Sequence, residues 1–141
     1  MRKSLSLHAK TLCALIAAAG IVAAQPSARA ATTDNFTVRT TADFVALCDT
    51  QPNGDNYVAA IHFCQGFAAG AYQYYAALAQ RDANERFVCP PDPPPSRNQA
   101  IAGFLAWAHA NPDAMTAPAV DSLFRYLGQT YPCSGAQRSA H

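Results

Sequence analysis

Apolar residues recur at three- and four-residue steps along most of the chain, which is the period of an amphipathic helix. The longest such stretch covers residues 56–79. Shorter stretches cover residues 42–49, residues 96–110 and a final segment with Pro118 in its first turn. We find no strand-like alternation of apolar and polar positions. The pattern therefore predicts a small all-α bundle of about four helices.

Local signals mark the ends of these helices. Thr41 is a good N-cap for the first helix, and Ser96 with Gln99 forms a capping box for the third. Pro118 is tolerated in a first turn, where its missing N–H costs nothing. The buried stripe expected on the last helix consists of Val120, Leu123, Phe124 and Leu127.

Two glycines, Gly66 and Gly70, lie four residues apart inside the long helical stretch. Each costs about 1 kcal/mol relative to Ala in a helix interior. Small residues at this spacing would let a neighbouring helix approach closely and offset that cost. The spacing therefore allows a close helix contact at these two positions.

The segment between the second and third helices lacks a helical pattern. Residues 81–86 are mostly charged, and residues 90–95 contain five prolines. Proline at this density excludes a helix and favours a stiff, extended strap.

The N-terminus has the pattern of a secretory signal peptide. Arg2, Lys3 and Lys10 precede an apolar run over residues 11–24, and an A-x-A-like site ends at Ala30. The run is too short to cross about 30 Å of hydrocarbon. We expect cleavage before Ala31, with cleavage after residue 24 as an alternative, and a periplasmic location without membrane attachment.

The remaining chain divides into three parts in this interpretation. Residues 31–40 form a flexible leader, residues 41–133 the helical domain, and residues 134–141 a polar tail. Removing residues 1–30 takes away four of the ten basic residues and none of the nine acidic ones, which leaves a net charge of −3. This weak negative charge argues against nucleic acid and against a polybasic membrane-binding mode.

The exported part keeps an even number of cysteines, because only Cys13 leaves with the signal peptide. Two disulfides with three possible connectivities are expected. If the last two helices form an antiparallel hairpin, Cys89 and Cys133 meet at one end, and Cys48 pairs with Cys64. This connectivity is favoured. The spacing contains no C-x-x-C and matches no zinc module, so no metal is expected.

The sequence contains no signature of a catalytic or nucleotide-binding site. His62 and His109 fall on helices and are interpreted as ordinary helix residues. Asp82, Glu85 and Asp92 lie in polar connecting segments, where a solvated loop is the simpler interpretation. We therefore expect no enzyme activity and no cofactor.

Several motifs resemble those of the Rap/Tai immunity family. The run over residues 44–48, followed by Phe63-Cys64-Gln65-Gly66-Phe67-Ala68-Ala69-Gly70, is similar to its Leu-x-x-Cys … Cys-x-Gly-aromatic-x-x-Gly pattern. Further similar stretches are Phe87-Val88-Cys89-Pro90, Phe104-Leu105 with Trp107, Asn111-Pro112 and Tyr131-Pro132-Cys133. The resemblance covers roughly residues 41–133.

The resemblance implies a small, all-helical periplasmic protein without catalysis. Family members bind peptidoglycan amidase effectors of type VI secretion and obstruct the active-site cleft, and several are homodimers. The expected contact regions are loops at helix ends.

Tyr72, Tyr74 and Tyr75 cannot all face one core, so at least one is expected to be exposed. The candidate partner-binding residues are Tyr72, Tyr74, Arg81, Asp82, Glu85, Arg86 and Asp113.

An HdeA-like acid-stress chaperone of the periplasm is the alternative. Such a protein is also small, helical and disulfide-braced, and it must loosen when its carboxylates are protonated. The nine acidic residues permit this mechanism. Four cysteines, where one disulfide would suffice, favour the immunity interpretation.

Overall fold

The computed structural model describes residues 30–135 of the chain. Almost all of the expected signal peptide, together with Cys13 and residues 136–141 of the expected tail, lies outside the described residues. The elements in chain order are η1 (Thr33–Thr37), α1 (Thr41–Cys48), α2 (Tyr57–Arg81), η2 (Ala83–Glu85), α3 (Arg97–Ala110), η3 (Pro112–Thr116) and α4 (Ala119–Thr130), where η denotes a 3-10 helix.

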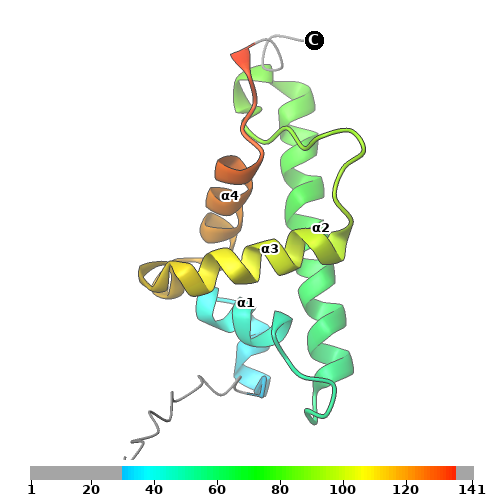
Figure 1. Ribbon diagram of the computed structural model, residues 1–141, viewed down its shortest axis with the longest axis vertical. Helices are drawn as coiled ribbons and strands as arrows, with labels where there is room; N and C mark the ends of the chain where they lie inside the picture. Colours follow the sequence, from blue (N-terminus) through cyan, green and yellow to red (C-terminus); the bar gives the residue numbers. More distant parts are fainter. Residues whose placement is uncertain (1–29, 136–141) are drawn as a thin grey trace, which may run out of the picture.

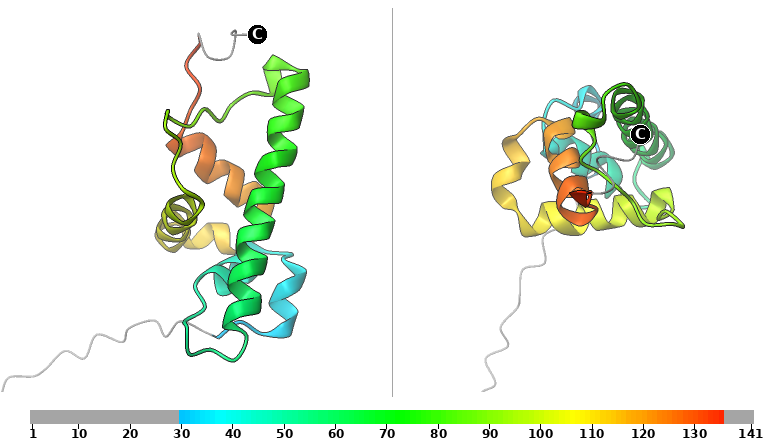
Figure 2. Two further views of the ribbon diagram at one scale, coloured as in Figure 1. Left: turned by 90° about the vertical axis from the view of Figure 1, so that its right-hand side faces the viewer. Right: turned by 90° about the horizontal axis from the view of Figure 1, so that it is seen from above.

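The prediction of a small all-α bundle is confirmed, because the described residues form four α-helices and no strand beyond two isolated bridges. Figure 1 shows α2 running along most of the molecule, with α3 lying across it. Helix α4 lies beside one half of α2, and α1 lies near the other half (Figures 1 and 2). No helix in the described region is long and apolar enough to cross a membrane.

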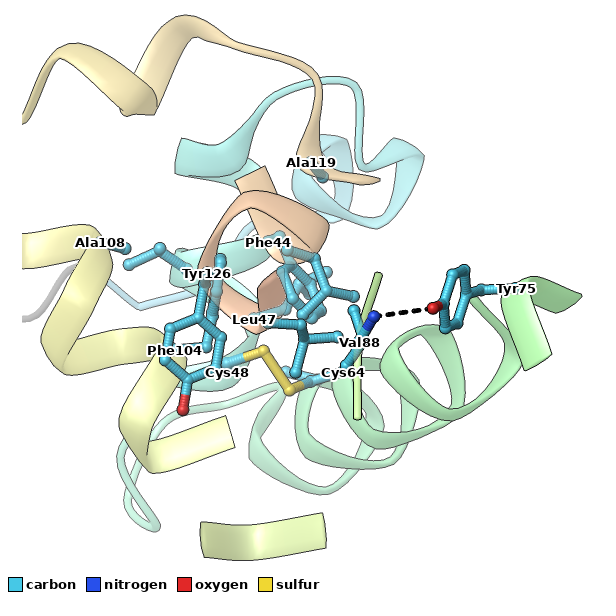
Figure 3. Close-up of a cluster of buried hydrophobic side chains, with 14 of the residues drawn as sticks. Phe44, Leu47, Cys48, Cys64, Tyr75, Val88, Phe104, Ala108, Ala119 and Tyr126 are labelled. Atoms are coloured by element: carbon cyan, nitrogen blue, oxygen red, sulfur yellow. Dashed lines mark hydrogen bonds between the residues drawn. A yellow bond between two sulfur atoms is a disulfide. The ribbon is translucent and has the colours of Figure 1, made fainter. Parts of the chain in front are cut away.

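The core gathers side chains from all four helices. Phe44 and Leu47 of α1, Cys64 of α2 and Phe104 of α3 are each no more than 1% exposed. The ring of Phe44 lies 5.2 Å from that of Phe104 and 4.9 Å from that of Phe67, measured between centroids. Figure 3 shows Phe44, Leu47 and Phe104 near the Cys48–Cys64 disulfide. Helix α1 contacts each of the other three α-helices, so it lies at the centre of the packing.

Helix α1 begins one residue earlier than expected. Thr40, not Thr41, is the N-cap: its hydroxyl accepts from the Asp43 N–H at 3.2 Å, and its own N–H donates to the Asp43 carboxylate at 3.0 Å. Thr41 is instead completely buried and donates its hydroxyl proton to the Ala117 carbonyl at 3.1 Å. The carboxylate three residues after Thr40 completes a capping box and decides between the two threonines. The Ser96–Gln99 capping box of α3 is present as predicted.

The buried face of α4 differs from the predicted stripe. Val120 is 42% exposed, and Phe124 is only partly buried. The buried residues of this helix are Ala119, Ser122, Leu123, Tyr126 and Leu127. Helix α3 lies close against α4 at Gly103, where an added Cβ would overlap the Tyr126 hydroxyl. The space left by that glycine receives the Tyr126 side chain, so the buried face of α4 includes Tyr126, whereas Val120 lies on its exposed side.

The close helix contact that the spacing of Gly66 and Gly70 allows does not form in the described part of the chain. Both glycines are exposed, and an added Cβ at either would meet no atom within 4 Å. Among the described residues, the helix contact that requires a glycine is at Gly103.

Residues 31–40 are not a loose leader in the structure. Asn35 donates from its side-chain amide to the Asp43 carboxylate at 3.0 Å, and the ring of Phe36 lies 5.4 Å from that of Phe63. Ala31 is only 5% exposed, and Val38 packs against the core. The apolar residues in this otherwise polar segment explain the difference, because they bury surface against α1 and α2.

The structure contains the Cys48–Cys64 and Cys89–Cys133 disulfides, which is the pairing favoured from the sequence. The geometry behind the second one is different, because α3 and α4 cross and do not form an antiparallel hairpin (Figures 1 and 2). The chain just before the strap pairs with the segment after α4 through an antiparallel bridge between Val88 and Pro132. The Cys89 N–H donates to the Tyr131 carbonyl at 2.8 Å.

Candidate partner-binding surface

Six of the seven candidate residues lie along the C-terminal half of α2 and the turn that follows it. Tyr72, Tyr74 and Arg81 belong to the C-terminal half of α2, Asp82 and Glu85 to the η2 turn, and Arg86 directly follows it. We call this group the α2–η2 surface. Asp113 lies in η3, well away from η2 in Figures 1 and 2, so the structure does not bring it to the other six.

The three neighbouring tyrosines occupy three different environments, as expected from their spacing. Tyr74 is 69% exposed, whereas Tyr75 is 8% exposed. Tyr72 is intermediate, and its ring centroid lies 6.0 Å from that of Tyr75. Burial raises the pKa of Tyr72, and the nearby Tyr75 raises it further. Tyr74 thus offers a largely exposed side chain to a partner, and Tyr72 a half-buried one.

Asp82 has a structural role besides its exposed position. Its carboxylate accepts from the Asn84 N–H at 2.9 Å, which caps the η2 turn. The turn is completed by the Glu85 N–H to the Asp82 carbonyl at 3.1 Å and by the Arg86 N–H to the Ala83 carbonyl at 3.1 Å. The charged segment over residues 81–86, in which the sequence shows no helical pattern, therefore contains an ordered turn.

The buried Tyr75 anchors the chain that follows this turn. Its hydroxyl oxygen accepts from the N–H groups of Phe87 and Val88, both at 2.8 Å. The Tyr75 ring also lies 4.9 Å from the Phe87 ring and 5.2 Å from the Phe124 ring. Figure 3 shows the bond from Val88 to Tyr75. Together with the Cys89–Cys133 disulfide, these hydrogen bonds fix the position of the chain that directly follows the α2–η2 surface.

The role of Tyr75 was missed at the sequence level, although a signal was present. Tyr75 lies on the apolar stripe of the long helix, and a hydroxyl on a buried face requires a hydrogen-bond partner. Nothing in the sequence identifies which backbone groups provide it.

The electrostatics of the surface are mixed, since it carries two arginines and two carboxylates. Tyr72 and Arg86 also line a hollow of about 350 Å³ between α2 and the start of the strap. His109 lies elsewhere, and its Nε2 is 3.5 Å from the Asp49 carboxylate, with the two side chains 56% and 36% exposed. No group of three or more His, Cys, Asp or Glu in the described region is placed to hold a metal ion. Exposed aromatic and arginine side chains on a rigid base suit recognition of another protein.

The fold defines a class: a small, all-helical protein braced by two disulfides. Comparison with protein families gives a match to the model of the Rap1a immunity proteins over residues 40–133. The chain therefore belongs to the Rap1a immunity protein family. Membership implies a non-enzymatic role in immunity against a type VI secretion effector. Comparisons with curated proteins and with solved structures gave no significant match.

Proposed function

We propose that the protein is exported to the periplasm, binds a peptidoglycan amidase effector of type VI secretion and obstructs its active-site cleft. The observation that carries the proposal is the family match, which spans all four α-helices and both disulfides. Two disulfides in so small a domain suit an oxidising compartment such as the periplasm. The signal-peptide pattern of residues 1–30 supports the same location.

The α2–η2 surface is the proposed contact with the effector, and Asp113 is a proposed second contact from η3. The Tyr75 bonds and the Cys89–Cys133 disulfide order the first surface before binding. A preordered surface loses little conformational entropy in the complex, which favours affinity. A homodimer, as implied by the family resemblance, belongs to the same proposal and is tested by light scattering of the purified protein.

The direct test is capture of the effector. Protein purified after export, with both disulfides formed, is immobilised and exposed to a secretion-active culture of the same bacterium. We expect stoichiometric, salt-resistant recovery of a peptidoglycan amidase, whose activity the protein then inhibits. Capture of many unfolded proteins at acid pH, and of no amidase at neutral pH, would instead indicate the chaperone.

The proposed surface has its own test with the captured amidase. Tyr74→Ala and Arg81→Ala are each expected to weaken binding about tenfold or more, as truncation of an interface anchor does. Their melting temperatures should change little, because both side chains are exposed. Arg39→Ala, an exposed arginine before α1, is the matched control. Unchanged affinity in alanine variants of all seven candidates would refute the surface and leave the immunity role standing.

A further inference from the structure

A second hollow of the molecule is left unused by the proposed function. A cavity of about 320 Å³ lies between α2, α3, α4 and the proline strap. This volume falls in the range of small-ligand pockets, which begins at about 300 Å³. Its residues come from segments far apart in the sequence, and no sequence pattern indicated it.

The cavity is apolar at its floor and polar only at its rim. The floor consists of Phe44, Phe104, Leu123 and Leu127, all of which are buried. Pro90, Pro94 and Pro95 of the strap form one wall, and proline has no N–H to offer a ligand. A polar molecule placed at such a floor would lose hydrogen bonds to water without replacement. The interior therefore suits a hydrocarbon chain.

The rim supplies one charge, and it is positive. Arg97, the first residue of α3, lines the cavity and is exposed. It forms no ion pair within the described part of the chain. Gln73 of α2 is the other polar side chain at the rim besides the tyrosines Tyr72 and Tyr131. A guanidinium beside an apolar hollow is complementary to a ligand with an apolar chain and an anionic end.

We propose that this cavity binds a single-chain amphiphile with an anionic head group. The hydrocarbon chain lies against the phenylalanine and leucine floor, and the head group accepts hydrogen bonds from Arg97. The inference does not depend on the proposed function, because it rests on the cavity and its rim alone.

The test uses three ten-carbon probes below their micelle concentrations: decanoate, decanol and decyltrimethylammonium. Binding to the exported, oxidised protein is measured by calorimetry, and the site is mapped by amide chemical shifts. We expect saturable, one-to-one binding of decanoate, with shifts in α3 and the strap. Decanol should bind more weakly, and decyltrimethylammonium more weakly still. Absence of saturable decanoate binding would overturn the proposal.

Two pairs of variants locate the chain and the head group. Ala100 lines the cavity, whereas Ala102 on the same helix is exposed and outside it. Ala100→Phe should abolish binding of decanoate and decanol, and Ala102→Phe should leave both unchanged. Arg97→Gln should weaken the binding of decanoate about tenfold and leave the binding of decanol unchanged. Arg39→Gln is the control for loss of one positive charge.

The outcomes that contradict the site are equally specific. Full decanoate affinity in a folded Ala100→Phe variant would place the ligand elsewhere. If Arg97→Gln and Arg39→Gln weaken decanoate binding equally, the effect comes from the net charge of the protein. This result would overturn the role of Arg97. If Ala100→Phe does not fold, the location of the site is decided by comparing Arg97→Gln with Arg39→Gln and by the amide chemical shifts.

Discussion

At the scale of single residues, Tyr75 shows how one buried hydroxyl organises the candidate surface. Its oxygen accepts two backbone N–H groups, and one of them belongs to Val88, which is 4% exposed. A buried N–H without a partner costs about 1–3 kcal/mol. The η2 turn, which precedes Phe87 and Val88 in the chain, is therefore linked through these two hydrogen bonds to the buried Tyr75.

Tyr75→Phe is expected to lower the free energy of unfolding by about 1–3 kcal/mol, because it removes the acceptor and keeps the ring. Tyr74→Phe, one position earlier and 69% exposed, should change it by less than about 0.5 kcal/mol. Chemical denaturation of both variants measures the difference. Equal stability of the two would show that the hydroxyl bonds contribute nothing net.

Asp43 gives the prediction for pH. Burial alone would raise its pKa, but hydrogen bonds from Asn35, from the N–H and hydroxyl of Thr40 and from the Arg39 backbone outweigh burial and lower it. A lowered folded-state pKa stabilises the fold above the ordinary pKa of Asp. That stability is lost as the pH falls through the lowered value.

Asp43→Ala should therefore cost about 1 kcal/mol at neutral pH, where it removes the charged half of the α1 capping box. The deficit should shrink at about pH 2, because the wild-type carboxylate is then being protonated as well. Melting temperatures at both pH values measure it, with the exposed Asp55→Ala as control. A deficit that does not depend on pH would contradict the role of the charge.

At the scale of the helices, the glycines of α2 and α3 play different structural roles. Gly66 and Gly70 are exposed with free space around them, whereas Gly103 makes room for Tyr126. The helical period is the same in both cases. The packing of α3 on α4 decides which glycine is required.

Gly66→Ala and Gly70→Ala should each stabilise the isolated protein by about 1 kcal/mol, since Ala is the better helix former and meets no neighbour. Gly103→Ala should destabilise it, because Tyr126 is 5% exposed and cannot move aside freely. Thermal melting of the three variants tests this. A loss of stability at Gly66 or Gly70 would mean that a second chain covers that face of α2.

At the scale of the whole molecule, the two disulfides close loops of different length. Cys48–Cys64 spans 16 residues and joins α1 to α2, and Cys89–Cys133 spans 44 residues and joins the residue before the strap to the segment after α4. On the chain-entropy model, the disulfides stabilise the fold by about 3 and about 4 kcal/mol. The second also holds the base of the α2–η2 surface.

Replacing both cysteines of a pair by serine tests the two roles separately. The Cys89/Cys133 pair should cost more stability than the Cys48/Cys64 pair, and it should also reduce amidase affinity. Denaturation and binding are measured on both double variants. Equal affinity in the two variants would show that the Cys89–Cys133 disulfide does not order the partner-binding surface.

The sequence by itself determined the elements of this protein. Helical periodicity located four helices, the Ser96–Gln99 box located the start of α3, and an even number of cysteines after residue 30 indicated two disulfides. These are local signals, or counts, and they do not depend on how the helices meet. Family motifs spread over residues 41–133 indicated the same class that the family match assigns.

Only the tertiary structure decided which faces and ends of those elements are used. It selected Thr40 over Thr41, turned Val120 towards solvent, and paired Tyr75 with the backbone after η2. It also made α3 cross α4, which opened the cavity beneath the strap. Each of these depends on contacts between residues far apart in the chain. Periodicity reports that a helix has an apolar side, whereas the neighbour that covers it is set by the packing of the whole core.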